Sequence, residues 1–206
     1  AGVGPITVDP AVQNSAIGRR LMDEVMRRAR EQGFAGVRLV QAAYHNRSLS
    51  LYTKLGFDTR EPLSCMQGPP LGLNESGRVV RCATQADTDE CCALCFKIHG
   101  HERRVDLREA IRLGVAMVSQ SNSRITGYTT GLGFLGHTVG DSSDDLKALI
   151  GAATEFPGPG FLLPTRNSEL LRWCLNNGLR IVMPMTLMST GLYNEPAGAF
   201  LPSVIY

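Results

Sequence analysis

The chain is predicted to have an α/β fold of the α+β kind, with two domains built on mixed, mostly antiparallel sheets. Apolar residues make up 43% of its 206 residues, which is enough for a packed core. Amphipathic helices alternate with short apolar strands along the whole chain. A stretch rich in glycine and proline, residues 68–77, separates two such sets of elements. We therefore expect domains over residues 1–67 and 78–206, joined by a linker over 68–77.

The first set of elements is predicted to begin with an apolar strand over residues 5–10 and a turn over residues 13–18. A helix follows directly and ends at Gly33. Its apolar face recurs at helical spacing in Ile17, Leu21, Met22, Val25, Met26 and Ala29. The first N–H groups of a helix have no intrahelical partner, so this turn can bind an anion at the positive end of the helix dipole. Arg19 and Arg20 add positive charge there.

Two strings in this segment resemble signatures of the GCN5-related N-acetyltransferases (GNAT). Gln13-x-x-Ala16-x-Gly18-Arg19 is similar to the family's pyrophosphate loop, Q/R-x-x-G-x-G/A, with alanine in place of the middle glycine. Such a loop tolerates alanine where its backbone φ is negative. Residues 46–57 are similar to N-x-x-a-x-x-l-Y-x-x-l-G-F, in which an asparagine lies near the cofactor and a tyrosine near its thioester sulfur. We expect this string to form a short helix that Asn46 caps and Gly56 closes.

The resemblance implies an N-acetyltransferase that uses acetyl-CoA as cosubstrate and an amine-bearing acceptor. In the resembling enzymes, strand N–H groups hold the pantetheine and polarise the carbonyl, and the loop holds the pyrophosphate. The residues implied to bind the cofactor are Ile6, Thr7, Val8, Gln13, Asn14, Ser15, Ala16, Ile17, Gly18, Arg19 and Asn46.

The catalytic residue that the resemblance implies is Tyr52, as the acid for the departing thiolate. A phenol with a pKa near 10 keeps its proton at neutral pH, which suits this role. By periodicity alone Tyr52 can equally be a core aromatic beside Leu49 and Leu55. His45, at the end of a strand, can be a base or can merely occupy the junction.

The second set of elements is predicted in the order β-α-α-β-β-β-α-β-α-β-β, which is the whole topology of the resembling family. Its counterpart of the pyrophosphate loop, residues 140–145, contains Asp141, Asp144 and Asp145. Three carboxylates would repel a diphosphate, so we interpret them as residues of a helix start. The chain is thus expected to be a tandem-domain member with a degenerate C-terminal copy.

Family members carry a strand, two helices and a hairpin before the cofactor strand, and none of these precedes Ala1. We therefore expect the first domain to be N-terminally incomplete. Another chain, as in a homo-oligomer, can complete its sheet, because an exposed edge beside Ile6 and Val8 favours pairing.

Composition favours a cytoplasmic enzyme without affinity for nucleic acid or membrane. The net charge is only +2, and no apolar run reaches the roughly 20 residues of a membrane span. Cys91, Cys95 and His99 share one helical face and raise the possibility of a metal site. A metal would need a fourth ligand from elsewhere and usually a tighter spacing than that of Cys91 and Cys95, so we expect reduced thiols in a core and no metal.

The alternative function is a non-catalytic acyl-CoA-binding or protein-interaction module. Ala16 in the loop and the losses in the second copy favour this alternative.

Overall fold

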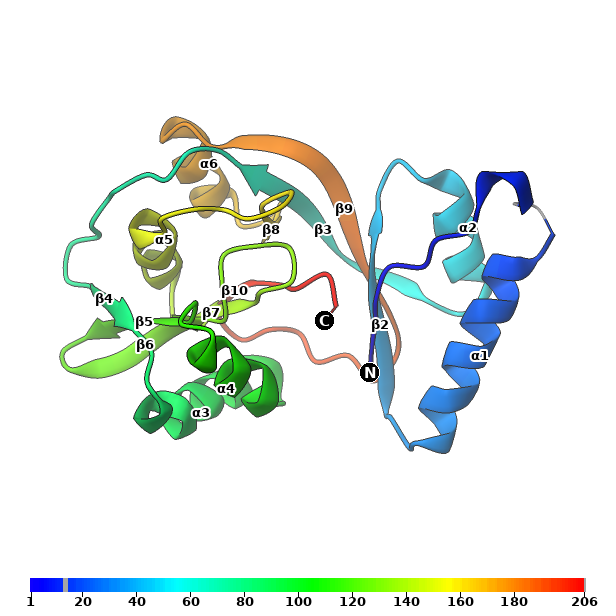
Figure 1. The fold of residues 1–206 in the computed structure, drawn as a ribbon, viewed down its shortest axis with the longest axis horizontal. Helices are drawn as coiled ribbons and strands as arrows, with labels where there is room; N and C mark the ends of the chain where they lie inside the picture. Colours follow the sequence, from blue (N-terminus) through cyan, green and yellow to red (C-terminus); the bar gives the residue numbers. More distant parts are fainter. Residues whose placement is uncertain (13–14, 206) are drawn as a thin grey trace. The chain divides into compact units, whose positions relative to one another are not determined.

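The computed structural model describes residues 1–12 and 15–205. In this part of the chain the strands form two five-stranded sheets, with the orders β1-β2-β9-β3-β8 and β10-β7-β6-β5-β4 (Figure 1). Strands β1 and β2 are parallel, whereas β2 with β9 and the neighbours in the second sheet are antiparallel. The predicted α+β class with mixed, mostly antiparallel sheets is confirmed.

By contacts the chain divides into two compact units. The first comprises Ala1–Leu63, Pro184–Tyr193 and the chain from Val204, and the second comprises Ser64–Met183 and Asn194–Ser203. The units thus differ from the expected linear division into 1–67, 68–77 and 78–206. This division follows the contacts between residues. It does not test whether the chain arose from two copies of one domain. The tandem arrangement and the incompleteness of the first domain stay predictions.

The first unit has two helices, α1 and α2, on one side of β2 (Figure 1). Strand β2 pairs with β9 from Gly36↔Gly191 to Ala42↔Met185, so residues far along the chain complete this unit. Its elements are β1 (Gly2–Val3), a 3₁₀ helix (Pro10–Val12), α1 (Ile17–Glu31), β2 (Gly36–Ala42), α2 (Asn46–Lys54), the start of β3 (Asp58–Gln67) and the end of β9 (Arg180–Gly191). Its buried core consists of Val3, Met22, Ala29, Val37, Leu39, Phe57 and Met188.

Helix α1 confirms the predicted amphipathic pattern with one exception. Met22 and Ala29 are buried, and Gly33 takes a φ of 70° just after the helix. Leu21, which was expected on the apolar face, is 43% exposed. It lies next to Met22 in sequence, and a helix that buries one of two adjacent residues turns the other away.

The predicted strand over residues 5–10 is wrong. Strand β1 ends at Val3, and a 3₁₀ helix begins at Pro10. Proline has no N–H to donate and a fixed φ, so Pro5 and Pro10 weaken any ladder with β2 at both ends of this segment.

The second unit confirms the predicted order β-α-α-β-β-β-α-β-α-β-β from β4 to β10. The sequence also predicts a helix from Thr84, where the structure has a 3₁₀ helix, Gln85–Asp87, followed by α3. It predicts a strand over 200–206, where β10 ends at Leu201. The remaining elements are β4 (Val79–Cys82), α3 (Thr88–His99), α4 (Arg104–Arg112), β5 (Met117–Ser121), β6 (Arg124–Thr129), β7 (Thr138–Gly140), α5 (Ser143–Ala152), β8 (Phe161–Pro164), α6 (Ser168–Asn176) and β10 (Ala199–Leu201).

The cysteines are free thiols, as predicted. Cys91, Cys92 and Cys95 lie in α3 and belong to the core of the second unit. Within residues 1–12 and 15–205, no group of three or more His, Cys, Asp or Glu side chains could hold a metal ion. Burial raises the pKa of the Cys91 thiol to about 12, which keeps it protonated.

No helix among the described residues is long and apolar enough to span a membrane. The cytoplasmic location and a homo-oligomer stay predictions.

Candidate functional site

The candidate site begins at the N-terminus of α1. Among the described residues, the first backbone bond into the helix runs from the Arg20 N–H to the Ala16 carbonyl at 3.0 Å, so the N–H groups of Ile17, Gly18 and Arg19 precede it. Within the described residues no side chain caps the helix, and its first turn contains no acidic residue. These N–H groups and the positive end of the helix dipole can therefore act together on an anion.

Ala16 is the N-cap residue and has a left-handed backbone, with φ 62° and ψ 10°. The expectation of a negative φ at this residue is wrong. An L-residue in this region costs about 1 to 2 kcal/mol because Cβ crowds the following carbonyl oxygen. The left-handed turn brings successive N–H groups together, a geometry that binds anions, and glycine would adopt it without strain.

Gly18 lies in the first turn of α1, where the fold itself does not require glycine. A Cβ built on Gly18 would lie 3.8 Å from Cδ2 of Leu51 and 3.9 Å from Cγ2 of Val8, which is ordinary van der Waals contact. Glycine in a helix is less stable than alanine by about 1 kcal/mol. The same contacts show that the helix start, α2 and the segment before the loop meet at this point.

The remaining loop residues are described in part. Gln13 and Asn14 lie outside the described residues. The Ser15 hydroxyl donates to the carbonyl of Val12 and so does not cap α1. Arg19 is 3.7 Å from Asp23 in an exposed pair, which contributes little to stability.

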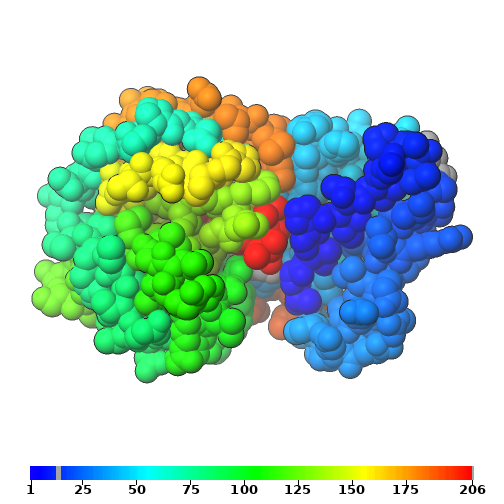
Figure 2. All heavy atoms as spheres, in the orientation of Figure 1, coloured from blue at the N-terminus to red at the C-terminus, as the bar shows by residue number. Residues whose placement is uncertain are grey.

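The segment from Ile6 to Val8 follows β1 without being a strand. Figure 2 shows this N-terminal segment in dark blue at the surface of the first unit. Ile6 packs partly against the core, and Thr7 is exposed. No backbone bond joins the N–H of Ile6 or Thr7 to an acceptor in residues 1–12 and 15–205. An extended ligand can therefore reach these two donors.

Asn46 is the first residue of α2 and does not cap it. The N-cap is His45, whose side chain makes no capping bond, so the predicted Asn46 cap is wrong. In the pattern N-x-x-a-x-x-l-Y the asparagine precedes the tyrosine by seven positions, and this spacing falls on His45. Gly56 follows the helix with a φ of 85°, as predicted for its close.

Tyr52 lies in α2 and packs partly buried against the core, with its ring centroid 6.1 Å from that of Phe57. Burial raises the pKa of its hydroxyl, so the proton stays in place at neutral pH. This placement is compatible with an acid and equally with a core aromatic.

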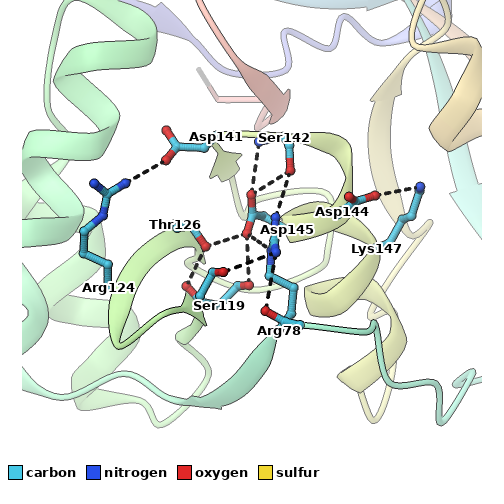
Figure 3. A network of polar contacts seen from close by, with 11 residues as sticks. Arg78, Ser119, Arg124, Thr126, Asp141, Ser142, Asp144, Asp145 and Lys147 are labelled. Carbon is cyan, nitrogen blue, oxygen red and sulfur yellow. Dashed lines mark hydrogen bonds and ion pairs between the residues drawn. The ribbon is translucent and has the colours of Figure 1, made fainter.

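The second unit has its own turn before a helix, where β7 leads into α5. There Asp145 is fully buried and accepts hydrogen bonds from the backbone N–H and hydroxyl of Ser142, at 3.1 and 3.0 Å (Figure 3). Arg78 donates to the same carboxylate at 2.7 Å and Thr126 at 2.5 Å. Asp144 pairs with Lys147. The interpretation as helix-start residues is confirmed for Asp144 and Asp145. Asp141 lies before the N-cap and pairs instead with Lys97 and Arg124.

Sequence reasoning missed the partners of Asp145. Arg78 is 67 positions away and directly precedes β4, and Thr126 comes from β6. No local pattern links an arginine before one strand to an aspartate in a distant helix. The Ser142-x-x-Asp145 spacing of a capping box is the one signal in the sequence that could have been recognised.

Three comparisons bear on this site. Residues 1–57 match the family model described as the Acetyltransferase (GNAT) family. No curated protein matches the chain.

Several solved structures are similar to the chain. A putative acetyltransferase from Pyrococcus horikoshii has 18% identity and a TM-score of 0.70, over 97% of this chain and 66% of that one. A GCN5-related N-acetyltransferase from Sphaerobacter thermophilus has 12% identity and a TM-score of 0.53, over 91% and 72%. A tandem GNAT protein from the clavulanic acid biosynthesis pathway has 11% identity and a TM-score of 0.52, over 90% and 73%.

At these identities the likenesses show a shared fold. The family match covers the first 57 of the 206 residues. The chain spans 66% of the length of the Pyrococcus horikoshii protein.

Proposed function

We propose that the chain is an acetyl-CoA-dependent N-acetyltransferase that acts on an amine of a small-molecule or peptide acceptor. The cofactor site would lie in residues 1–67, and residues 78–206 would form a degenerate GNAT-like domain. The observation that carries this proposal is the N-terminus of α1, which has three early N–H groups, no acidic residue in its first turn and a glycine that the fold does not need.

The residues of the loop fit a diphosphate. The N–H groups of Ile17, Gly18 and Arg19 would donate to its oxygens, and Gly18 would let it approach the backbone closely. The N–H groups of Ile6 and Thr7 would hold the pantetheine and polarise the acyl carbonyl. Val8, Gln13, Asn14, Ser15 and Ala16 complete the proposed set by resemblance alone, and Asn46 is proposed with them although the asparagine position of the motif falls on His45.

Acetyl-CoA, when bound, supplies an activated acetyl group as a thioester. The hydroxyl of Tyr52 would give its proton to the departing sulfur, and its raised pKa keeps that proton available. The acceptor amine must be neutral to attack, which requires a base.

The second unit would hold no acyl-CoA, because Asp145 places a buried carboxylate at the start of α5. A second anion beside it would be repelled.

Titration of the full chain with acetyl-CoA, followed by a free-thiol release assay with a panel of amines, tests the proposal. We expect one acetyl-CoA per chain and thiol release that depends on an amine. Absence of binding would refute the cofactor site and with it the transferase.

Tyr52→Phe tests the acid role because it keeps the ring and removes the proton. The turnover number should fall by about 100-fold with little change in acetyl-CoA affinity. Tyr44→Phe, at a tyrosine that is 61% exposed in the same unit, is the matched control. Turnover of Tyr52→Phe at the wild-type rate would leave Tyr52 as a core aromatic.

The alternative is a non-catalytic acyl-CoA-binding or protein-interaction module. The strained backbone of Ala16 favours it, since a loop under selection for phosphate binding gains from glycine at that position. Binding of acetyl-CoA without amine-dependent thiol release would support this alternative.

A further inference from the structure

Gln41, near the end of β2, is only 5% exposed. Its Nε2 and Oε1 are both buried, and neither has a hydrogen-bond partner in the part of the chain that the structure describes. Native proteins pair nearly all such atoms, and a buried amide without partners costs about 1 to 3 kcal/mol. This amide therefore points to a ligand.

The Gln41 side chain lies on the same face of β2 as the candidate site. Side chains alternate along a strand, so Gln41 shares a face with Val37 and Leu39. Both of these belong to the core that α1 and α2 cover, and Tyr52 packs against that core from α2.

Gln41 also lies beyond the point where β1 and β2 part. Their parallel ladder ends at the pair Val3↔Leu39, and the segment after it turns away from β2 toward α1 (Figure 1). On the other side Gln41 pairs with Thr186 of β9. Among the described residues, the end of β2 thus has a strand on one side only, and the other side faces the segment that contains Ile6 and Thr7.

We propose that Gln41 binds the pantetheine arm of acyl-CoA through its side-chain amide. This inference rests on the proposed function. The arm is chemically suited to the position because its amide groups each offer an N–H and a C=O. Nε2 can donate to such a carbonyl while Oε1 accepts from such an N–H, which would satisfy both buried atoms. Gln41 is then a binding residue that positions the thioester and takes no part in proton transfer.

The test compares two probes on the full chain by calorimetry: acetyl-CoA, and 3′-phospho-ADP, which is the headgroup without the arm. Gln41→Leu should weaken acetyl-CoA binding by about 10-fold, the worth of two neutral hydrogen bonds, and leave 3′-phospho-ADP binding unchanged. Because leucine removes a buried amide without partners, the melting temperature of the ligand-free chain should stay or rise. Gln32→Leu, an exposed change in the same unit, should alter none of these values.

Unchanged acetyl-CoA affinity in Gln41→Leu would overturn the inference and leave the proposed function intact. A lower melting temperature with equal loss of both probes would also overturn it, since the amide would then support the fold. If the wild-type chain binds neither probe, the proposed function fails and the inference fails with it.

Discussion

Helices α1 and α5 both follow a turn that presents early N–H groups, and the two turns satisfy these groups differently. At α5, Ser142 caps the helix and the carboxylate of Asp145 bonds back to the turn. At α1, no side chain in the described residues does either. We call the turn before α5 closed, because the carboxylate of Asp145 already occupies the helix start. We call the turn before α1 open, because a helix start without its own carboxylate can bind an anion from outside.

The glycines of the two turns, Gly140 and Gly18, also differ in whether the fold leaves room for a side chain. A Cβ on Gly140, before α5, would lie 2.8 Å from Cβ of Asp145, so the fold requires glycine there. A Cβ on Gly18 would meet only ordinary contacts. The packing of Asp145 thus requires glycine at the turn before α5, whereas nothing in the described structure requires it at Gly18.

The largest expected effect comes from Asp145→Ala, which opens the closed turn. Arg78, whose side chain is 20% exposed, would lose its buried partner. Removing one member of a buried pair destabilises by about 3 to 5 kcal/mol. Urea unfolding measures the change. Asp144→Ala, which breaks the half-exposed pair with Lys147, is the control and should cost less than about 1 kcal/mol. Equal losses would refute a special role for Asp145.

Gly18→Asp closes the open turn with a carboxylate. The new charge would occupy the position proposed for the diphosphate, so the dissociation constant of acetyl-CoA should rise by about 100-fold or more. The melting temperature should hold or increase slightly, because an acidic residue favours a helix N-terminus. Gly18→Ala, which should be stable, checks that a Cβ fits. An unchanged affinity in Gly18→Asp would refute the loop assignment.

Ser142→Ala measures the cap of α5. Loss of an N-cap hydroxyl costs about 1 kcal/mol, seen as a lower midpoint of unfolding. Ser15→Ala is the counterpart at α1, where the hydroxyl bonds to the Val12 carbonyl and does not cap. Its effect should be under about 0.5 kcal/mol. A loss as large as that of Ser142→Ala would show that Ser15 caps α1 in solution.

Ala16→Gly should give the smallest effect. Relief of the left-handed strain outweighs the greater freedom of glycine in the unfolded chain, for a net gain of about 0.5 kcal/mol. Urea unfolding of the variant and of the wild-type chain measures the difference in their free energies of unfolding. Ala11→Gly, where the φ is not positive, should lose stability instead. A loss in Ala16→Gly would contradict the observed backbone of Ala16.

Much of the fold follows from local patterns in the sequence. The helical period predicts α1 with Met22 and Ala29 buried, and the order of elements from β4 to β10 is predicted without error. The prediction of a strand over residues 5–10 is wrong because it relied on the apolar residues of this segment and gave too little weight to its two prolines.

Contacts between distant segments are where the sequence is least informative. Nothing local to Ala42 indicates that Met185 lies opposite it, or that Arg78 pairs with Asp145. At the candidate site, the N–H groups of α1 follow from the helix start. The left-handed φ of Ala16 and the buried amide of Gln41 depend on the folded surroundings and could not be predicted.

The pairing of β2 with β9 sets a timing constraint on synthesis. The paired residues are about 150 positions apart, so the first unit has high contact order and should fold slowly. A ribosome adding 5 to 20 residues per second needs on the order of ten seconds to supply β9 after β2 has emerged. During this interval Val37, Leu39 and Phe57 lack Met188, and nascent β2 presents an unpaired apolar edge. Chaperone dependence in the cell would therefore arise from residues 36–57, although residues 185–191, which are translated much later, complete their fold.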